Sequence, residues 1–188
     1  SGEEDNTIVI FTSDNGCAAN ANYKVLKAKG HNPSYIYSGN KGSYLEGGHR
    51  VPFIVKWPEK IKANSISDAT ICTTDFMATC ADIVDYNLKD NEAEDSYTML
   101  PLLLQKEGFT REATIHHSKE GVFAIRKGSW KLVDSKGSGG WTYNGKDAQF
   151  DLQLYNLEED PGEQNNLVEK YPELVKELKE KVDEYKKL

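Results

Sequence analysis

Unbroken apolar runs mark the two strands expected in the first half of the chain. Residues 8–11 read Ile, Val, Ile, Phe, and residues 53–55 read Phe, Ile, Val. Continuous runs of β-branched and aromatic residues are typical of strands covered on both faces, as in a parallel sheet. A crossover segment normally precedes such a strand, and none stands before residue 8. We therefore expect the chain to be the C-terminal portion of a longer protein.

The second half of the chain changes to short runs separated by turns. Residues 114–117, 122–126, 130–133 and 152–155 have strand propensity, with glycine and lysine between several of them. This pattern predicts an antiparallel sheet. Near Pro172 a helix is predicted to begin and to pack on that sheet, because apolar residues then recur at helical spacing. These residues are Leu174, Val175, Leu178, Val182 and Tyr185.

A further helix is predicted to start within residues 73–79. Thr74 is a candidate N-cap, and Asp75 favours the positive end of the helix dipole. The apolar stripe that follows contains Phe76, Met77, Cys80 and Ile83. Cys72 and Cys80 lie in apolar surroundings, so we expect both to be small core residues.

Composition excludes several classes of protein. The chain has 188 residues, 28% charged and 38% hydrophobic, which is typical of a globular protein. Its net charge of −7 argues against a nucleic-acid partner, since phosphate binding needs a basic stripe. We expect no membrane partner, because no apolar run approaches the roughly 18 residues of a membrane span. The three cysteines form no CxxC pair, which argues against a disulfide framework and a zinc ribbon.

Candidate metal ligands follow the first strand. Ser13, Asp14, Asn15 and Gly16 come directly after it, and ligands of open α/β sheets collect at the carboxyl ends of strands. A carboxylate and an amide oxygen are hard ligands that suit Ca²⁺ or Mg²⁺. The same four residues are also ordinary turn composition. The loop at residues 17–45 is too long for a simple connection, so we expect it to be functional.

These segments together resemble the C-terminal part of a type I sulfatase, in the arylsulfatase branch of the alkaline phosphatase superfamily. The resemblance rests on residues 13–16, on Lys41, Gly42 and Ser43, and on residues 46–52. Supporting similarity extends over nearly the whole chain, at residues 73–79, 95–96, 99–101, 123–133 and 154–163.

The resemblance implies an α/β fold with two parts. Residues 1–108 would be the C-terminal part of the catalytic α/β domain. Residues 109–188 would be a small α+β C-terminal subdomain with an antiparallel sheet and a C-terminal helix.

The resemblance also implies the hydrolysis of sulfate esters by a formylglycine nucleophile and a divalent cation, Ca²⁺ with Mg²⁺ as an alternative. Asp14 and Asn15 would be two of the metal ligands. Lys41 would be the catalytic lysine that contacts the sulfate group, where fixed positive charge stabilises the equatorial oxygens. The alternative for Lys41 is a solvated loop lysine.

Four further residues have candidate roles. His116 and His117 lie in a predicted strand, so alternation sends them to opposite faces. The resemblance makes either a candidate substrate contact, against the alternative of an ordinary surface or core histidine. We expect His49 to help order the loop that carries Lys41, and Arg50 to pair with a carboxylate.

The nucleophile signature of the family, Cys/Ser-x-Pro/Ala-x-Arg, does not occur around Cys17, Cys72 or Cys80. We therefore expect formylglycine in a missing upstream part, and predict that this chain alone hydrolyses nothing and binds the metal weakly. Expected partners are that N-terminal part of the catalytic domain and a sulfated small molecule or sulfated glycan. A periplasmic or secreted location is a family expectation.

Two alternatives stay open. One is a phosphatase or phosphodiesterase of the same superfamily that uses two zinc ions. Such sites place a histidine beside the strand-end aspartate, where this chain has Asn15. The other is a non-catalytic carbohydrate-binding or interaction module, which the aromatic residues Trp141 and Tyr143 keep open.

Overall fold

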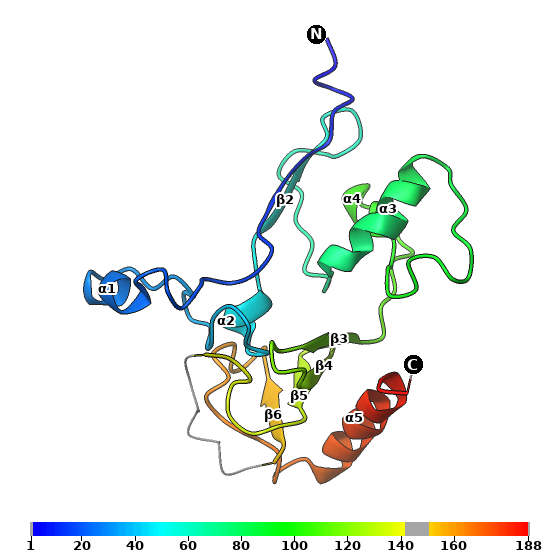
Figure 1. Ribbon diagram of the computed structural model, residues 1–188. Coiled ribbons are helices and arrows are strands. Elements are labelled where there is room, and N and C mark those ends of the chain that lie inside the picture. Colours follow the sequence, from blue (N-terminus) through cyan, green and yellow to red (C-terminus); the bar gives the residue numbers. More distant parts are fainter. Residues whose placement is uncertain (1, 142–150, 188) are drawn as a thin grey trace. The chain divides into compact units, whose positions relative to one another are not determined.

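The computed structural model describes residues 2–141 and 151–187. Tyr143, one of the two aromatic residues of the predicted excursion, lies outside these residues. The fold divides into two compact units (Figure 1). The first unit is Ser1–Thr12 with Pro52–Thr114, and the second is Ser13–Val51 with Ile115–Leu188. Each unit contains two separate stretches of the sequence, whereas the prediction has a single boundary at residue 108. That boundary stays a prediction.

The sheet of the first unit has two strands. β1 (Val9–Thr12) pairs with β2 (Phe53–Lys56) in antiparallel register, from Val9 opposite Lys56 to Thr12 opposite Phe53. Both strands stand where the apolar runs predict them. The predicted parallel pairing is wrong for this pair of strands. Phe11 is 63% and Ile54 61% exposed among the described residues, and burial on both faces of the strand stays a prediction.

The helices of the first unit are η1 (Thr73–Asp75), α3 (Phe76–Ile83) and α4 (Leu100–Leu103). The predicted helix start is confirmed, but the cap is formed by Cys72 and Asp75 in place of Thr74. The backbone N–H of Cys72 donates to Asp75 Oδ2 at 2.7 Å. Small residues form the buried side of α3, namely Ala78, Thr79 and Ala81. Cys80 is exposed and Cys72 half-buried, so the prediction of a core position is wrong for Cys80.

The second unit contains the predicted antiparallel sheet, in the order β3-β4-β5-β6. Its strands are β3 (Thr114–His117), β4 (Phe123–Lys127), β5 (Trp130–Val133) and β6 (Gln153–Asn156). β5 pairs antiparallel with both of its neighbours. The predicted helix is α5 (Pro172–Tyr185), which runs beside β4 and β5 (Figure 1) and buries Val175, Leu178 and Val182.

Two short helices interrupt the segment predicted as a long loop and the motif after it. They are α1 (Tyr23–Ala28) and α2 (Glu46–His49). Tyr44 lies just before α2, is fully buried, and joins a core cluster with Leu45, Val133 and Tyr155. Gln153 Nε2 donates to the Tyr44 hydroxyl at 2.9 Å, so this loop is fastened to β6. Among the described residues, every helix is too short or too polar to cross a membrane.

Candidate functional site

Two backbone hydrogen bonds bring the predicted site loops together in the second unit. The N–H of Gly16 donates to the carbonyl of Gly48 at 2.9 Å, and the N–H of Lys41 donates to the carbonyl of Cys17 at 2.9 Å. Asp14 and Asn15 precede Gly16 directly. The chain therefore holds the candidate oxygen ligands and the candidate lysine on adjoining stretches of backbone.

Glycines make this close approach possible. A Cβ atom on Gly16 would lie 1.9 Å from the carbonyl oxygen of Gly47, and one on Gly48 would lie 2.2 Å from that of Ser43. No side chain fits at such distances without displacement of the backbone. Gly16 is therefore needed for the contact between the two loops, and Gly48 for the tight path of the second loop.

The candidate metal ligands present two kinds of oxygen. Asp14 is exposed. Asn15 Nδ2 donates to the carbonyl of Gly16 at 2.9 Å, which orients the amide and leaves its Oδ1 for a ligand. Both oxygens suit a hard cation, but Ca²⁺ takes about 6–8 oxygens, and the described residues contain no group of three or more His, Cys, Asp or Glu that could hold a metal. The pair fits part of a calcium site, and its role stays a prediction.

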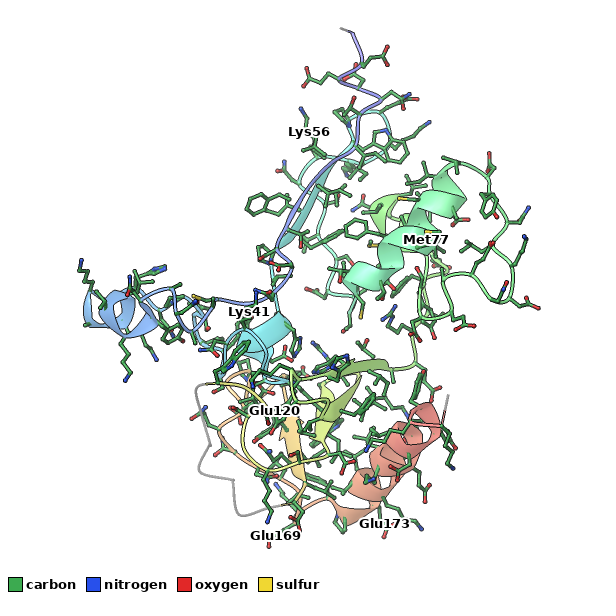
Figure 2. The ribbon with its side chains drawn as sticks, viewed as in Figure 1. Lys41, Lys56, Met77, Glu120, Glu169 and Glu173 are labelled. Carbon is green, nitrogen blue, oxygen red and sulfur yellow. The ribbon has the colours of Figure 1, made fainter. Side chains whose placement is uncertain are left out.

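Lys41 stands in a rigid turn beside α2 (Figure 2). The N–H of Ser43 donates to the carbonyl of Asn40 at 2.9 Å, and Ser43 Oγ donates to the carbonyl of Ser138 at 2.7 Å. Asn40 and Ser43 are buried, whereas Lys41 between them is only partly buried. The backbone is thus fixed while the lysine side chain reaches the surface.

A buried ion cluster lies directly behind this loop and was not predicted. We name it the Glu46 cluster: Glu46, Lys131 and Glu163. Lys131 Nζ lies 3.0 Å from Glu46 Oε1 and 2.8 Å from Glu163 Oε1. The backbone N–H of Glu46 also donates to Glu163 Oε2 at 2.6 Å. All three side chains are at most 1% exposed. In the sequence, the position of Lys131 within the apolar strand β5 is the feature that indicates a buried carboxylate partner.

The pKa values of the two carboxylates of the Glu46 cluster shift in opposite directions. Burial alone would raise the pKa of Glu46, but the ammonium of Lys131, with help from His49 and Arg126, lowers it to about 2. Burial raises the pKa of Glu163, and Lys131 opposes that shift only in part. Arg50 NH1 also donates to Glu46 Oε2 at 3.2 Å, which confirms the predicted carboxylate partner of Arg50.

Of the three histidines near the candidate site, two form a packed pair and one is exposed. His49 Nε2 and His116 Nε2 lie 3.0 and 3.1 Å from the carbonyl oxygen of Tyr44, and their rings are 4.1 Å apart. Burial, with Lys131 nearby, lowers the pKa of His49 to about 4, and burial beside His49 lowers that of His116. His117 is exposed, and its Nδ1 lies 2.9 Å from the carbonyl oxygen of Ser118. The role of His116 and His117 as substrate contacts stays a prediction.

Taken together, a carboxylate, an amide oxygen and a lysine lie on adjoining loops whose backbone is held rigidly. Such a set suits an anion that is shared between a hard cation and an ammonium group.

Comparisons with known proteins point in one direction. A protein-family model described as "Sulfatase" matches residues 1–86. N-acetylgalactosamine-6-O-sulfatase of Bacteroides thetaiotaomicron is 37% identical over 188 residues, covering 97% of this chain and 37% of that protein. Arylsulfatase of Hemicentrotus pulcherrimus is 31% identical, covering 68% of this chain and 22% of that protein.

Solved structures agree in fold. A structure from a study of how Bacteroides thetaiotaomicron metabolises multiple glycosaminoglycans has a TM-score of 0.85 at 36% identity, covering 98% of this chain and 40% of that one. The PsFucS1 sulfatase from Pseudoalteromonas has a TM-score of 0.75 at 22% identity, covering 98% of this chain and 37% of that one. The chain thus spans less than half the length of these relatives.

Proposed function

This chain belongs to the sulfatase family, and on that premise we propose that it supplies one side of a catalytic site for the hydrolysis of sulfate esters. The observation that carries the proposal is the pair of hydrogen bonds from Gly16 to Gly48 and from Lys41 to Cys17. They join the loop of Asp14 and Asn15 to the loop of Lys41, which are the residues that the family resemblance assigns to the cation and to the sulfate.

Each of these side chains has a defined task in the proposed site. Asp14 and Asn15 would hold a divalent cation, Ca²⁺ in the first instance, which when bound supplies positive charge to the sulfate oxygens. Lys41 would contact the sulfate directly and stabilise the charge that develops on its equatorial oxygens. The hydrogen-bonded turn at Lys41 favours this role, because it fixes the backbone from which the lysine side chain extends.

We further propose that the substrate is a sulfated sugar. Two relatives support this substrate class by name, N-acetylgalactosamine-6-O-sulfatase and N-acetylglucosamine-6-O-sulfatase. The described residues of this chain do not include a nucleophile motif, so the chain alone is expected to show no turnover.

The test measures hydrolysis of an aryl sulfate and of N-acetylgalactosamine 6-sulfate by the intact protein that contains this chain. Asp14→Ala and Lys41→Ala should each lower kcat/KM by about 10²-fold or more, since each removes charge stabilisation from the transition state. Lys24→Ala is the matched control, because Lys24 is an exposed lysine of α1.

Two outcomes would contradict the proposal. One is an Asp14→Ala variant with wild-type activity. The other is an intact protein that hydrolyses an aryl phosphate but not the aryl sulfate, which would instead favour the phosphatase alternative.

A further inference from the structure

Trp141 is an exposed aromatic residue beside the loop that carries Lys41. It is 59% exposed. Its Cζ3 atom lies 2.8 Å from the position that a Cβ atom on Gly42 would occupy, so the indole rests on the backbone next to Lys41. Gly42 also has a φ of +87°, which favours glycine. The indole therefore contacts the chain one residue away from the proposed sulfate contact.

The segment that leads to Trp141 is anchored on the same loop. Ser43 Oγ donates to the carbonyl of Ser138 at 2.7 Å. A Cβ atom on Gly139 would lie 2.6 Å from the ring of Tyr44, and one on Gly140 would lie 3.2 Å from Ser43. Trp141 thus follows three residues that are packed directly against residues 43 and 44.

Lys119 holds the indole from one face. Its Nζ lies 4.8 Å from the ring centroid of Trp141, within the range of a cation–π contact. Its backbone N–H donates to the carbonyl of Gly42 at 2.9 Å, and its Nζ lies 3.3 Å from Glu120 Oε1. Figure 2 shows Glu120 in the turn between β3 and β4. Lys119 and Gly42 thus hold the indole from two sides, and 59% of Trp141 stays exposed.

A large aromatic side chain that is held in place yet exposed is typical of a binding anchor, because its apolar area gains most when a ligand covers it. A sugar ring is well suited to such a surface, since its C–H bonds cover the indole while its hydroxyl groups stay in water. A sulfated sugar with its sulfate at Lys41 has its own ring, or the next ring of the chain, close to Trp141.

We infer that Trp141 is a stacking platform for a sugar ring of the substrate, held in position by Lys119 and Gly42. The inference rests on the proposed function, since it places a sulfated sugar at Lys41. It adds a binding contact that the family motifs do not contain.

The test compares Trp141→Ala with the wild type in the intact protein, using a disaccharide that contains N-acetylgalactosamine 6-sulfate. KM should rise about tenfold, equal to about 1.4 kcal/mol of binding, while kcat stays within about twofold, because stacking is equally strong in ground and transition states. Trp141→Phe keeps a flat ring and should restore part of the loss. Tyr86→Ala is the matched control, because Tyr86 is also an exposed aromatic residue, at 52%.

Calorimetric binding of the desulfated disaccharide, which is the reaction product and has no sulfate left to hydrolyse, gives a second readout that does not depend on turnover. Trp141→Ala should raise the dissociation constant about tenfold. The thermal midpoint of the protein should not change. Equal KM and equal dissociation constants for wild type and Trp141→Ala would overturn the inference. If the wild-type protein binds the desulfated disaccharide through Trp141 but does not hydrolyse the sulfated disaccharide, the proposed function is refuted. The role of Trp141 in sugar binding is then still supported.

Discussion

Both units of the molecule bury carboxylate groups, and the units differ in how this negative charge is balanced. In the first unit, Asp75 accepts N–H bonds from Cys72 at 2.7 Å and Tyr97 at 3.0 Å, and pairs with Arg111. In the second unit, Lys131 bridges Glu46 and Glu163, and Glu46 also pairs with Arg50 at 3.2 Å and Arg126 at 3.7 Å. Asp75 therefore keeps hydrogen-bond donors of its own, whereas Glu163 depends on Lys131 and one backbone N–H.

The two arrangements also stabilise different kinds of structure. The contacts of Asp75 with Cys72, Tyr97 and Arg111 span 3, 22 and 36 residues, all within the first unit, and the shortest of them fixes a helix start. The contacts of Glu46 with Lys131 and with Glu163 span 85 and 117 residues. The Glu46 cluster thus joins α2, next to the candidate site, to β5 and to the turn after β6. We expect it to position the Lys41 loop, and the Asp75 contact to have only a local effect.

Lys131→Met should have the largest effect. The variant leaves two buried carboxylates without their shared ammonium, and removing one partner of a buried ion pair costs about 3–5 kcal/mol. Thermal unfolding of the intact protein measures the loss. The matched control is Lys127→Met, whose salt bridge to Glu177 at the surface is worth about 0–1 kcal/mol. Equal midpoints for the two variants would mean that the Glu46 cluster does not stabilise the fold.

Arg111→Met should have an intermediate effect. Asp75 loses its ion pair, but it keeps the N–H bonds from Cys72 and Tyr97. We therefore expect a loss of about 2 kcal/mol, the range for a buried polar group that loses one of its partners. The same unfolding experiment measures it, and activity per folded molecule should not change. A loss larger than that of Lys131→Met would reverse the ranking of the two clusters.

Local features of the fold follow from the sequence more directly than long-range contacts do. Strand and helix positions follow from local periodicity, and β2, β3 to β6, α3 and α5 stand where that periodicity predicts them. The cap by Asp75 was missed in favour of Thr74, although both lie in the same turn. Cys80 was placed in the core because its neighbours are apolar, but helix α3 buries its small residues instead.

Long-range features could not be read in the same way. The apolar run of β1 predicts a strand, but its exposure depends on which strand pairs with it and on what covers the sheet. The meeting of Lys131 with Glu46 and Glu163 depends on the register of β5 and on the path of the turn at residue 163. By contrast, short motifs predict Asp14, Asn15 and Lys41 as site residues. The structure brings their loops together through backbone hydrogen bonds, and their roles stay predictions.

The smallest predicted effect concerns pH and the histidines beside the Glu46 cluster. His116 faces His49, Lys131 and Glu46, and its pKa is lowered by burial and by His49. A histidine whose folded pKa is lowered contributes stability that is fully present above its unfolded pKa of about 6.5 and is lost as the pH falls below it. Between about pH 7.5 and about pH 5.8 this loss is at most about 1 kcal/mol per histidine.

His116→Asn removes this titration and retains a side-chain N–H for the carbonyl of Tyr44, so its thermal midpoint should fall less than that of the wild type over the same pH range. Glu163 has a raised pKa, so its contribution to the free energy of unfolding increases as the pH falls. That contribution is common to both proteins and cancels in the difference. Glu46, with a pKa of about 2, loses stability only at lower pH. His31→Asn, at an exposed position, should follow the wild type. Parallel curves for His116→Asn and the wild type would show that His116 titrates normally in the folded protein, and that the polar groups behind the Lys41 loop are better hydrated than their burial indicates.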